Sequence, residues 1–419
     1  MQDSSTAPKI FLSAGEASGE RYGAMLIEAL RARRPQARFF GLGGVQMEAA
    51  GCERIVRAEE IAVMGITEVV RHLPAIYGKY RALVRSLRER KPNLAVLIDF
   101  PDVNFRLAKH LHRQGVPVVW FVSPQLWAWK PKRIRWVRER VSRMLVIFPF
   151  EERYYRERGV EAVFVGHPLA DVPPPQMTRA AFAQEHDLDA EKHWVGLLPG
   201  SRKKELRLNL PEMLRAASLL GPQHEYVLPV APTLDAAWVR EEVRSADAAL
   251  GASVAVRVVT DARATLRHAR ASLVASGTAT VEAALAGHPF VVVYRISALS
   301  YSVAQRLVRV PHVAMVNLIA EARIVPELIQ REFTAENVAQ QMEPLLDDGP
   351  ERASMIAALA NVRTALQVAA KPKAEPSAGP SAAPGTAIDR AAEQVLQMLA
   401  EAEPRSPERA YLAPNVSTT

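Results

Sequence analysis

The sequence contains one cysteine, Cys52, in 419 residues. A single thiol cannot close a disulfide within the chain, and no group of Cys and His residues has the spacing of a zinc site. The first residues lack a basic start followed by a long apolar run, so we expect no signal peptide. These absences predict a cytoplasmic protein without a structural metal.

Long uncharged stretches are also scarce. The longest covers residues 272–294, SLVASGTATVEAALAGHPFVVVY, and is interrupted by Glu282, His288 and Pro289. These residues fall where one secondary-structure element would end and the next begin, so a strand, a helix and a second strand explain the stretch better than a membrane span.

Acidic residues are outnumbered by basic ones. The chain has 53 Lys and Arg against 45 Asp and Glu, a formal net charge of +8, and a pI of about 9.6. Such a surface favours anionic partners, which include nucleic acid, acidic lipid and phosphorylated substrates. With 49% hydrophobic and 23% charged residues, the composition is that of a globular protein and excludes a disordered or fibrous chain.

Short apolar, β-branched runs alternate with longer amphipathic segments. One series extends from KIFLSAG to AVFVGHP and a second from WVGLLPGS to PFVVVYRIS, and the proline-rich segment ADVPPPQMT separates them. This alternation is typical of β-α units on parallel sheets. The sequence therefore predicts two α/β domains, residues 1–170 and 171–370, with a ligand site in the cleft between them.

The end of the chain has a different composition. Residues 371–387 are rich in Pro, Ala, Ser and Gly, which predicts a flexible insertion. Residues 388–403 have helical periodicity, and we expect this helix to pack back on the body of the protein. Residues 404–419 are predicted to be a disordered tail.

The segment SAGEASGE, residues 13–20, follows the first predicted strand. Ser13 or Ser18 is available to cap the next helix, and Gly15 lets the backbone approach a ligand closely. The carboxylate of Glu16 can accept hydrogen bonds from ligand hydroxyls. The alternative is a plain turn between strand and helix.

The segment LIDFPDVN, residues 97–104, places Asp99 at the carboxyl end of an apolar strand. Partial burial there would raise the pKa of the carboxyl and suit it to general-base catalysis. A structural role is the alternative for Asp99. For Asp102 the simplest interpretation is a helix N-cap.

The segment LLPGSRKKE, residues 197–205, resembles an anion site. Gly200 and Ser201 can form a nest of backbone amides, and Arg202 can bind a diphosphate with two donors at once. A turn followed by a charged helix is the alternative.

The segment SGTATVE, residues 276–282, joins a strand to a helix in the second series. Amides at the helix start and nearby hydroxyls would bind an anion, aided by the helix dipole. Glu282, expected on the first turn, would accept hydrogen bonds from a ribose diol. The residues of this predicted site are Ser276, Gly277, Thr278, Thr280 and Glu282.

Residues 122–143 place Trp127, Trp129 and Trp136 among basic side chains. Indole and Lys or Arg together suit the headgroup region of an anionic membrane. They also suit nucleic acid, because aromatic rings stack on bases. A solvated helical face is the ordinary interpretation of such charge.

The motifs SAGEASGE, VMGITEV, LIDFPDVN, VSPQLWAW, FPFE, VGHPL, LLPGSR and SGTATVE occur in this order along the chain. In this respect the sequence resembles the lipid-A-disaccharide synthases of Gram-negative bacteria. The resemblance covers residues from about 10 to 369 and resumes in the last predicted helix. The Pro/Ala-rich insertion and the tail depart from the family pattern without touching a motif.

The resemblance implies two Rossmann-like domains of the GT-B type and an inverting glycosyl transfer between them. It implies UDP-2,3-diacylglucosamine as donor and 2,3-diacylglucosamine 1-phosphate, lipid X, as acceptor. Asp99 would be the general base, and Asn317 and Gln330 would line the donor pocket. No cofactor or metal is expected. The enzyme would act at the cytoplasmic face of the inner membrane, peripherally bound to its anionic surface, as a possible homodimer.

Residues 61–80 are expected to contribute an acyl groove, with a buried helix as the alternative. Two other functions compete with the synthase. A UDP-N-acetylglucosamine 2-epimerase shares the fold but acts on a substrate without acyl chains. A nucleic-acid-binding protein would use the tryptophan-rich stretch but leave the other motifs unexplained, so we expect no nucleic-acid partner.

Overall fold

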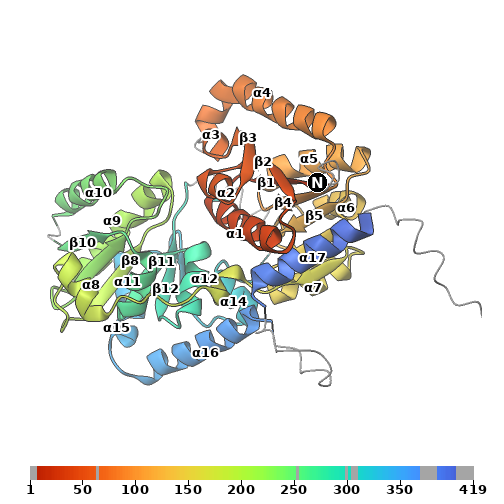
Figure 1. The fold of residues 1–419 in the computed structure, drawn as a ribbon. Helices are drawn as coiled ribbons and strands as arrows, with labels where there is room; N and C mark the ends of the chain where they lie inside the picture. The colour runs from red at the N-terminus through yellow and green to blue at the C-terminus, as the bar shows by residue number, and fades with distance from the viewer. Residues whose placement is uncertain are drawn as a thin grey trace, which may run out of the picture.

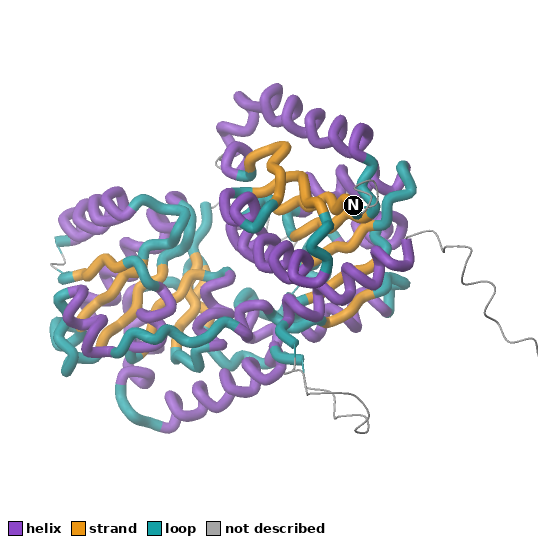
Figure 2. Tube along the Cα trace, viewed as in Figure 1, coloured by secondary structure: helices purple, strands orange, loops and turns teal. Residues whose placement is uncertain are grey.

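The computed structural model describes residues 7–62, 66–251, 254–297, 301–302, 310–368 and 385–402, without the side chains of residues 61–76. Two α/β domains lie side by side (Figure 1), and each has a sheet between helices (Figure 2). This architecture confirms the predicted fold class. The domain boundaries at residues 170 and 370 stay a prediction.

The N-terminal sheet has seven strands in the order β3-β2-β1-β4-β5-β6-β7, and all neighbouring pairs are parallel. The central strand β4 is fully buried, because helices cover both faces of the sheet. The strands are β1 (Lys9–Ala14), β2 (Arg38–Gly43), β3 (Cys52–Arg57), β4 (Leu94–Ile98), β5 (Val118–Phe121), β6 (Arg143–Val146) and β7 (Ala162–Phe164). The helices are α1 (Ala17–Arg33), α2 (Val45–Ala49), α3 (Glu59–Ala62), α4 (Ile66–Arg90), α5 (Pro101–Arg113), η1 (Pro131–Arg133), α6 (Ile134–Arg140) and α7 (Pro149–Arg156).

The C-terminal sheet has six parallel strands in the order β10-β9-β8-β11-β12-β13. They are β8 (Trp194–Leu198), β9 (Glu225–Pro229), β10 (Val256–Val259), β11 (Ala271–Ala275), β12 (Phe290–Tyr294) and β13 (Glu327–Ile329). The helices are α8 (Arg179–His186), α9 (Lys203–Leu220), α10 (Ala236–Leu250), α11 (Ala262–His268), α12 (Thr278–Leu285), α14 (Met315–Ala320), α15 (Ala335–Leu346) and α16 (Pro350–Leu366).

Both sheets reverse their winding direction at one place, between β1 and β4 and between β8 and β11. At such a point the loops that follow the two strands diverge to opposite faces and leave a crevice at the carboxyl edge. The sequence motifs SAGEASGE, LIDFPDVN, LLPGSRKKE and SGTATVE all follow one of these four strands. The fold therefore gathers the predicted site residues at two sheet edges.

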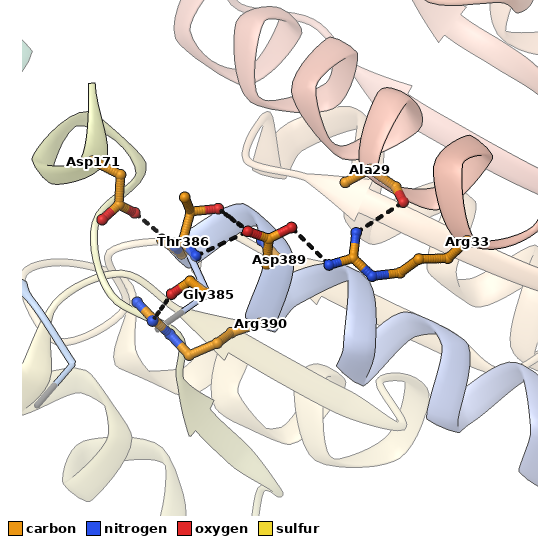
Figure 3. A network of polar contacts seen from close by, with 8 residues as sticks. Ala29, Arg33, Asp171, Gly385, Thr386, Asp389 and Arg390 are labelled. Atoms are coloured by element: carbon orange, nitrogen blue, oxygen red, sulfur yellow. Dashed lines mark hydrogen bonds and ion pairs between the residues drawn. The ribbon is translucent and has the colours of Figure 1, made fainter. Parts of the chain in front are cut away.

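The last helix, α17 (Ala387–Ala402), packs against α1, in agreement with the expectation for residues 388–403. Polar contacts fix its start (Figure 3): Asp389 forms an ion pair with Arg33 at 2.7 Å, and Asp171 accepts a hydrogen bond from the Ala387 amide at 2.6 Å. Asp171 ends η2 (Pro168–Asp171), the short helix that follows the N-terminal sheet. The C-terminal helix thus belongs to the packing of the N-terminal domain.

Several sequence predictions fall outside the described residues. Of the predicted flexible insertion at 371–387, only residues 385–387 are described. The predicted tail at 404–419 lies entirely outside the described residues. Most side chains of the expected acyl groove, residues 61–80, are also outside the description. Within the described part of the chain, no helix is both long and apolar enough to cross a membrane.

Candidate active site

The carboxyl edge of the N-terminal sheet brings three loops together. Ala14 of β1 pairs with Ile98 of β4, and Ile98 pairs with Phe121 of β5. Because these strands are parallel and end in register, the residues that follow them lie next to one another. Gly15, Asp99 and the loop after Phe121 therefore share one edge, as the sequence predicted for Gly15 and Asp99.

The turn that carries Asp99 is strained. Asp99 and Phe100 have φ angles of 44° and 47°, in the left-handed region that non-glycine residues rarely occupy. The phenyl ring of Phe100 lies over Gly15, where an added Cβ atom would come within 2.3 Å of the ring. Gly15 is thus needed to make room for Phe100, and its role in approaching a ligand stays a prediction.

Asn104 holds this turn in place. Its buried amide donates hydrogen bonds to the carbonyl oxygens of Asp99, at 2.7 Å, and Ile98, at 3.2 Å. Its side-chain oxygen accepts the hydroxyl of Ser13 at 2.7 Å. Ser13 is fully buried in β1 and is occupied by this bond, so it does not cap α1, and its role in ligand binding stays a prediction. The sequence analysis gave Asn104 no role of this kind, although its place five residues after Asp99 was the available signal.

The electrostatic surroundings of Asp99 match those of a general base. The pKa of its carboxyl is raised from the usual 3.8 to about 7, mainly by burial and in smaller part by the negative charge of Glu16. A hydrogen bond from the Phe100 amide acts in the opposite direction. A carboxyl with a pKa close to neutrality can both accept and release a proton at physiological pH.

Two predicted helix caps differ from the structure. The N-cap of α1 is Glu16 without a side-chain cap, so Ser18 lies inside the first turn of the helix. The N-cap of α5 is Phe100, because the strained turn places Pro101 at the first helical position. Asp102 therefore does not cap α5, and its carboxylate pairs with Arg133 at 3.2 Å.

Arg202, at the start of α9, forms a contact between the two domains. Its guanidinium lies 3.6 Å from the carboxylate of Glu16 in the N-terminal domain and 3.1 Å from Glu205 on its own helix. Both partners are carboxylates, which are the kind of group that a diphosphate would replace. The side chain is 67% exposed, so it remains accessible to a ligand.

The predicted nest at Gly200 and Ser201 is already occupied. The Ser201 amide donates to the Glu205 carboxylate at 3.1 Å, and Gly200 has a φ of 124°, which favours glycine. A Cβ atom at Gly200 would come within 2.7 Å of Glu205. The nest therefore binds an anion from its own helix in this structure. Glu205 belongs to the motif LLPGSRKKE, but this role of its side chain was not predicted.

The start of α12 is open. Gly277 is its N-cap, with no side-chain cap, and no protein atom lies within 4 Å of the position of an added Cβ. Thr278 is exposed and no acidic residue occupies the first turn. Ser276 makes a long contact of 3.5 Å to the Val313 carbonyl. The Ser276 amide donates to the Val293 carbonyl at 3.3 Å. The positive end of the helix dipole favours an anion at such an uncapped start, and the anion site itself stays a prediction.

Two residues of SGTATVE lie differently from the prediction. Thr280 is fully buried and its hydroxyl donates to the Gly277 carbonyl at 2.8 Å, so it does not line the open site. Glu282 lies on the second turn of α12, because the helix begins at Thr278. Burial raises the pKa of the Glu282 carboxyl, while Arg21 and Arg263 lower it. Burial is the main cause that raises the pKa of Tyr22, which lies on α1 in the opposite domain. The negative charges of Glu282 and Asp99 also raise this pKa.

Asn317 and Gln330 have structural partners. Asn317 is fully buried, and its amide donates to the Val325 carbonyl and to Glu327 while its oxygen accepts the amides of Ile324 and Val325. Its hydrogen-bonding capacity is used within the protein, and the prediction that it lines the donor pocket stays untested. Gln330 follows β13 with a φ of 56° and donates to the Ile296 carbonyl at 3.2 Å.

The tryptophan-rich stretch is more enclosed than expected. Trp127 donates its indole N–H to Glu151, and Trp136 packs edge-on against Phe105 with ring centroids 5.6 Å apart. Lys130 lies over the ring of Trp129. All three rings are half-buried, so they do not form an open row of indoles at the surface.

Two cavities lie away from the shared edge. One of about 710 Å³ is at the opposite, amino end of β4 and β5, beside Asn93 and Pro117. The other, of about 520 Å³, lies between α1, η2 and the start of α17. Among the described residues, no three His, Cys, Asp or Glu side chains are grouped to hold a metal ion. The expectation that the reaction needs no metal stays a prediction.

The arrangement of two Rossmann-like domains recurs in known structures. The calicheamicin glycosyltransferase superposes with a TM-score of 0.56 at 18% identity and covers 95% of this chain and 100% of its own. The glycotransferase of kitacinnamycin superposes with a TM-score of 0.57 at 16% identity and covers 94% of this chain and 99% of its own. A structure titled as a putative UDP-N-acetylglucosamine 2-epimerase from Listeria monocytogenes superposes with a TM-score of 0.56 at 14% identity. It covers 84% of this chain and 91% of its own. These likenesses define the GT-B fold.

The sequence comparisons identify the family within this class. A family model described as lipid-A-disaccharide synthetase matches residues 10–376. The lipid-A-disaccharide synthase of Acidobacterium capsulatum is 66% identical over 371 residues, which cover 86% of this chain and 92% of the relative. That of Koribacter versatilis is 53% identical over 360 residues, covering 86% and 93%. The chain belongs to the lipid-A-disaccharide synthetase family, and it is a glycosyltransferase of lipid A disaccharide synthesis.

Proposed function

We propose that this enzyme transfers the sugar of UDP-2,3-diacylglucosamine to 2,3-diacylglucosamine 1-phosphate with inversion at the anomeric carbon. The observation that carries the proposal is Asp99: a carboxyl with a pKa raised to about 7, at the carboxyl edge that faces Arg202. Such a group is suited to deprotonate a hydroxyl during its attack. Family membership supports the disaccharide product but leaves the substrates and the stereochemistry to this proposal.

In the proposed step, Asp99 takes the proton of the acceptor's 6-hydroxyl. The oxygen forms a bond to the anomeric carbon from the face opposite UDP, and the bond from that carbon to the UDP oxygen breaks with its electron pair. The products are UDP and the β-1,6-linked disaccharide 1-phosphate. A single displacement of this kind inverts the anomeric centre, and the proton remains on Asp99 until solvent removes it.

The C-terminal domain supplies the proposed UDP site. Arg202 and the start of α12 at Ser276, Gly277 and Thr278 would stabilise the charge that grows on the leaving diphosphate. Gly200 and Ser201 would contribute their nest if the diphosphate displaces Glu205. Glu282 would accept hydrogen bonds from the ribose, and Gln330 would lie beside the uridine.

The test is release of UDP from UDP-2,3-diacylglucosamine in detergent without added metal, measured with and without lipid X. Release that requires lipid X and yields a disaccharide supports the proposal. Release of UDP without an acceptor would overturn the proposal, because it would point to a hydrolase or an epimerase. Arg202→Ala should weaken UDP binding, whereas Asp99→Ala should retain it and lose most of the turnover.

We also propose that the basic stretch binds the anionic inner-membrane surface from the cytoplasmic side. Lys132, Arg135 and Arg138 are exposed on η1 and α6. Each basic residue near an anionic surface contributes about 1 kcal/mol. Replacing Lys132 and Arg138 with Glu should reduce sedimentation with anionic vesicles, with vesicles of neutral lipid as the control. A homodimer stays a prediction, which sizing by light scattering would test.

A further inference from the structure

Glu151 is a buried acidic residue outside the predicted site. It lies on α7, is 1% exposed, and accepts three hydrogen bonds. The hydroxyl of Ser123 donates at 2.6 Å and the indole N–H of Trp127 at 3.0 Å, both to the same carboxylate oxygen. The Phe148 amide donates to the second oxygen at 3.3 Å. Two of these bonds therefore come from the loop that follows β5.

A second residue of α7 holds the same loop. Tyr155 lies four residues after Glu151, on the same face of the helix, and its hydroxyl donates to the Pro124 carbonyl at 2.7 Å. Residues 123, 124 and 127 are thus fixed from one helix face. We call residues 122–129 the edge loop.

A carboxylate in this position requires an explanation. Burial raises the pKa of Glu151 to about 7, and none of the ion pairs between described residues involves it. An apolar residue would fill the space without the cost of burying a charge. Indole and backbone N–H groups can only donate, so the loop and the start of α7 need an acceptor at this point.

The edge loop begins beside Asp99. The Phe121 carbonyl, at the end of β5, accepts the Asp99 amide at 3.1 Å. The next residue, Val122, has a φ of 63°, which is strongly unfavourable for a β-branched side chain. Such a conformation persists only when the surrounding contacts enforce it. The hydrogen bond that the next residue, Ser123, donates to Glu151 is placed to do so.

We infer that Glu151 is a positioning residue for the transfer reaction: its carboxylate fixes the edge loop through Ser123 and Trp127, and the loop fixes Asp99. Glu151 does not touch the reacting atoms in this scheme. The inference rests on the proposed role of Asp99, because it explains how that carboxyl is oriented. A misplacement of about 1 Å at such a site can lower turnover about 100-fold.

The test compares variants that break the contact from either side. Glu151→Ala removes the acceptor, whereas Ser123→Ala and Trp127→Phe each remove one donor and leave Glu151 in place. Glu151→Gln keeps a carbonyl oxygen that can accept from both loop residues. Glu152→Gln is the matched control, because Glu152 is next in the same helix but pairs with Arg156 and the Phe164 amide. Each variant is assayed in the full chain for turnover, UDP affinity and tryptophan emission.

We expect Glu151→Ala to lose about 100-fold in turnover with UDP affinity unchanged, since UDP binds in the other domain. Trp127→Phe should lose about tenfold alone and add little in the Glu151→Ala background. The turnover of Glu151→Gln should stay within about fivefold of that of the wild type, and the turnover of Glu152→Gln should equal that of the wild type.

Three results would overturn the inference. Full turnover in both Glu151→Ala and Trp127→Phe would show that the edge loop does not position Asp99. Additive losses would show that Glu151 and Trp127 act separately. A Glu151→Gln variant as inactive as Glu151→Ala, with normal UDP binding, would make Glu151 a proton carrier. If the wild type itself lacks lipid-X-dependent UDP release, the proposed function fails instead.

Discussion

Replacing Asp99 with Asn should stabilise the protein while removing its activity. The folded-state pKa of the Asp99 carboxyl is about 7, against 3.8 for the ordinary group, a difference of about 3 units. Between these two values the folded protein holds a proton that the unfolded chain releases, so this carboxyl makes the protein less stable as the pH rises through the window. Asn has nearly the same shape, tolerates the left-handed conformation and cannot ionise.

The magnitude follows from 1.36 kcal/mol per pKa unit. At pH 8, above both values, the carboxylate costs about 4 kcal/mol that Asn avoids. At pH 5 the folded-state carboxyl is protonated, and the cost falls to about 1–2 kcal/mol. The difference between the costs at the two pH values, about 2–3 kcal/mol, cancels effects that do not depend on pH, such as burial of the Asn amide.

The assay is differential scanning calorimetry of both proteins at pH 5 and pH 8. For a domain of this size about 1 kcal/mol shifts the Tm by roughly 2–4 °C, so the Asn variant should gain roughly 5–10 °C more at pH 8 than at pH 5. A gain that is equal at the two pH values would refute the reasoning, because Asp99 would then have an ordinary pKa. Glu28→Gln on an exposed face of α1 is the matched control.

Three further predictions follow from the same contacts. Glu16→Gln should move the acidic limb of the kcat/KM profile to lower pH, because the Glu16 charge helps to raise the Asp99 pKa; an unmoved limb would contradict this. Gly15→Ala should cost about 1–3 kcal/mol of stability by urea titration and lower turnover, because the new Cβ meets the Phe100 ring; wild-type behaviour would show that the ring moves freely. Asn317→Ala should cost about 2 kcal/mol and leave UDP affinity within about threefold, as a calorimetric titration would show; a large loss of affinity at normal stability would restore Asn317 to the pocket.

The fold was predictable because hydrophobic pattern determines it. Continuous apolar runs such as LAVLI form strands that are buried on both faces, and the intervening segments have the length and polarity of covering helices. The parallel arrangement then places every strand-to-helix motif at a carboxyl edge. The position of Asp99 and the open start of α12 at Gly277 therefore followed from sequence alone.

Side-chain directions at these edges were not predictable in the same way. Ser13, Thr280 and Asn317 were predicted to face a ligand, but each is fully buried and hydrogen-bonded within the protein. A polar residue in a glycine-rich turn can serve the ligand or the turn, and the local sequence is the same in both cases. The choice depends on contacts with distant residues, such as Ser13 with Asn104, which are 91 positions apart.

The backbone strain shows which loops the fold holds most tightly. Lys91, Asp187 and Glu321 have positive φ angles directly after helices, where such a residue is an ordinary helix terminus. Asp99, Val122 and Gln330 instead follow strands at carboxyl edges, where nothing in the helix geometry requires this conformation. Each costs about 1–3 kcal/mol and must be enforced by neighbouring contacts. Buried polar groups supply these contacts: Asn104 binds the Asp99 turn and Glu151 binds the edge loop. At the carboxyl edge of the N-terminal sheet, strain and buried polar groups therefore occur together, where the proposed reaction requires a carboxyl in one orientation.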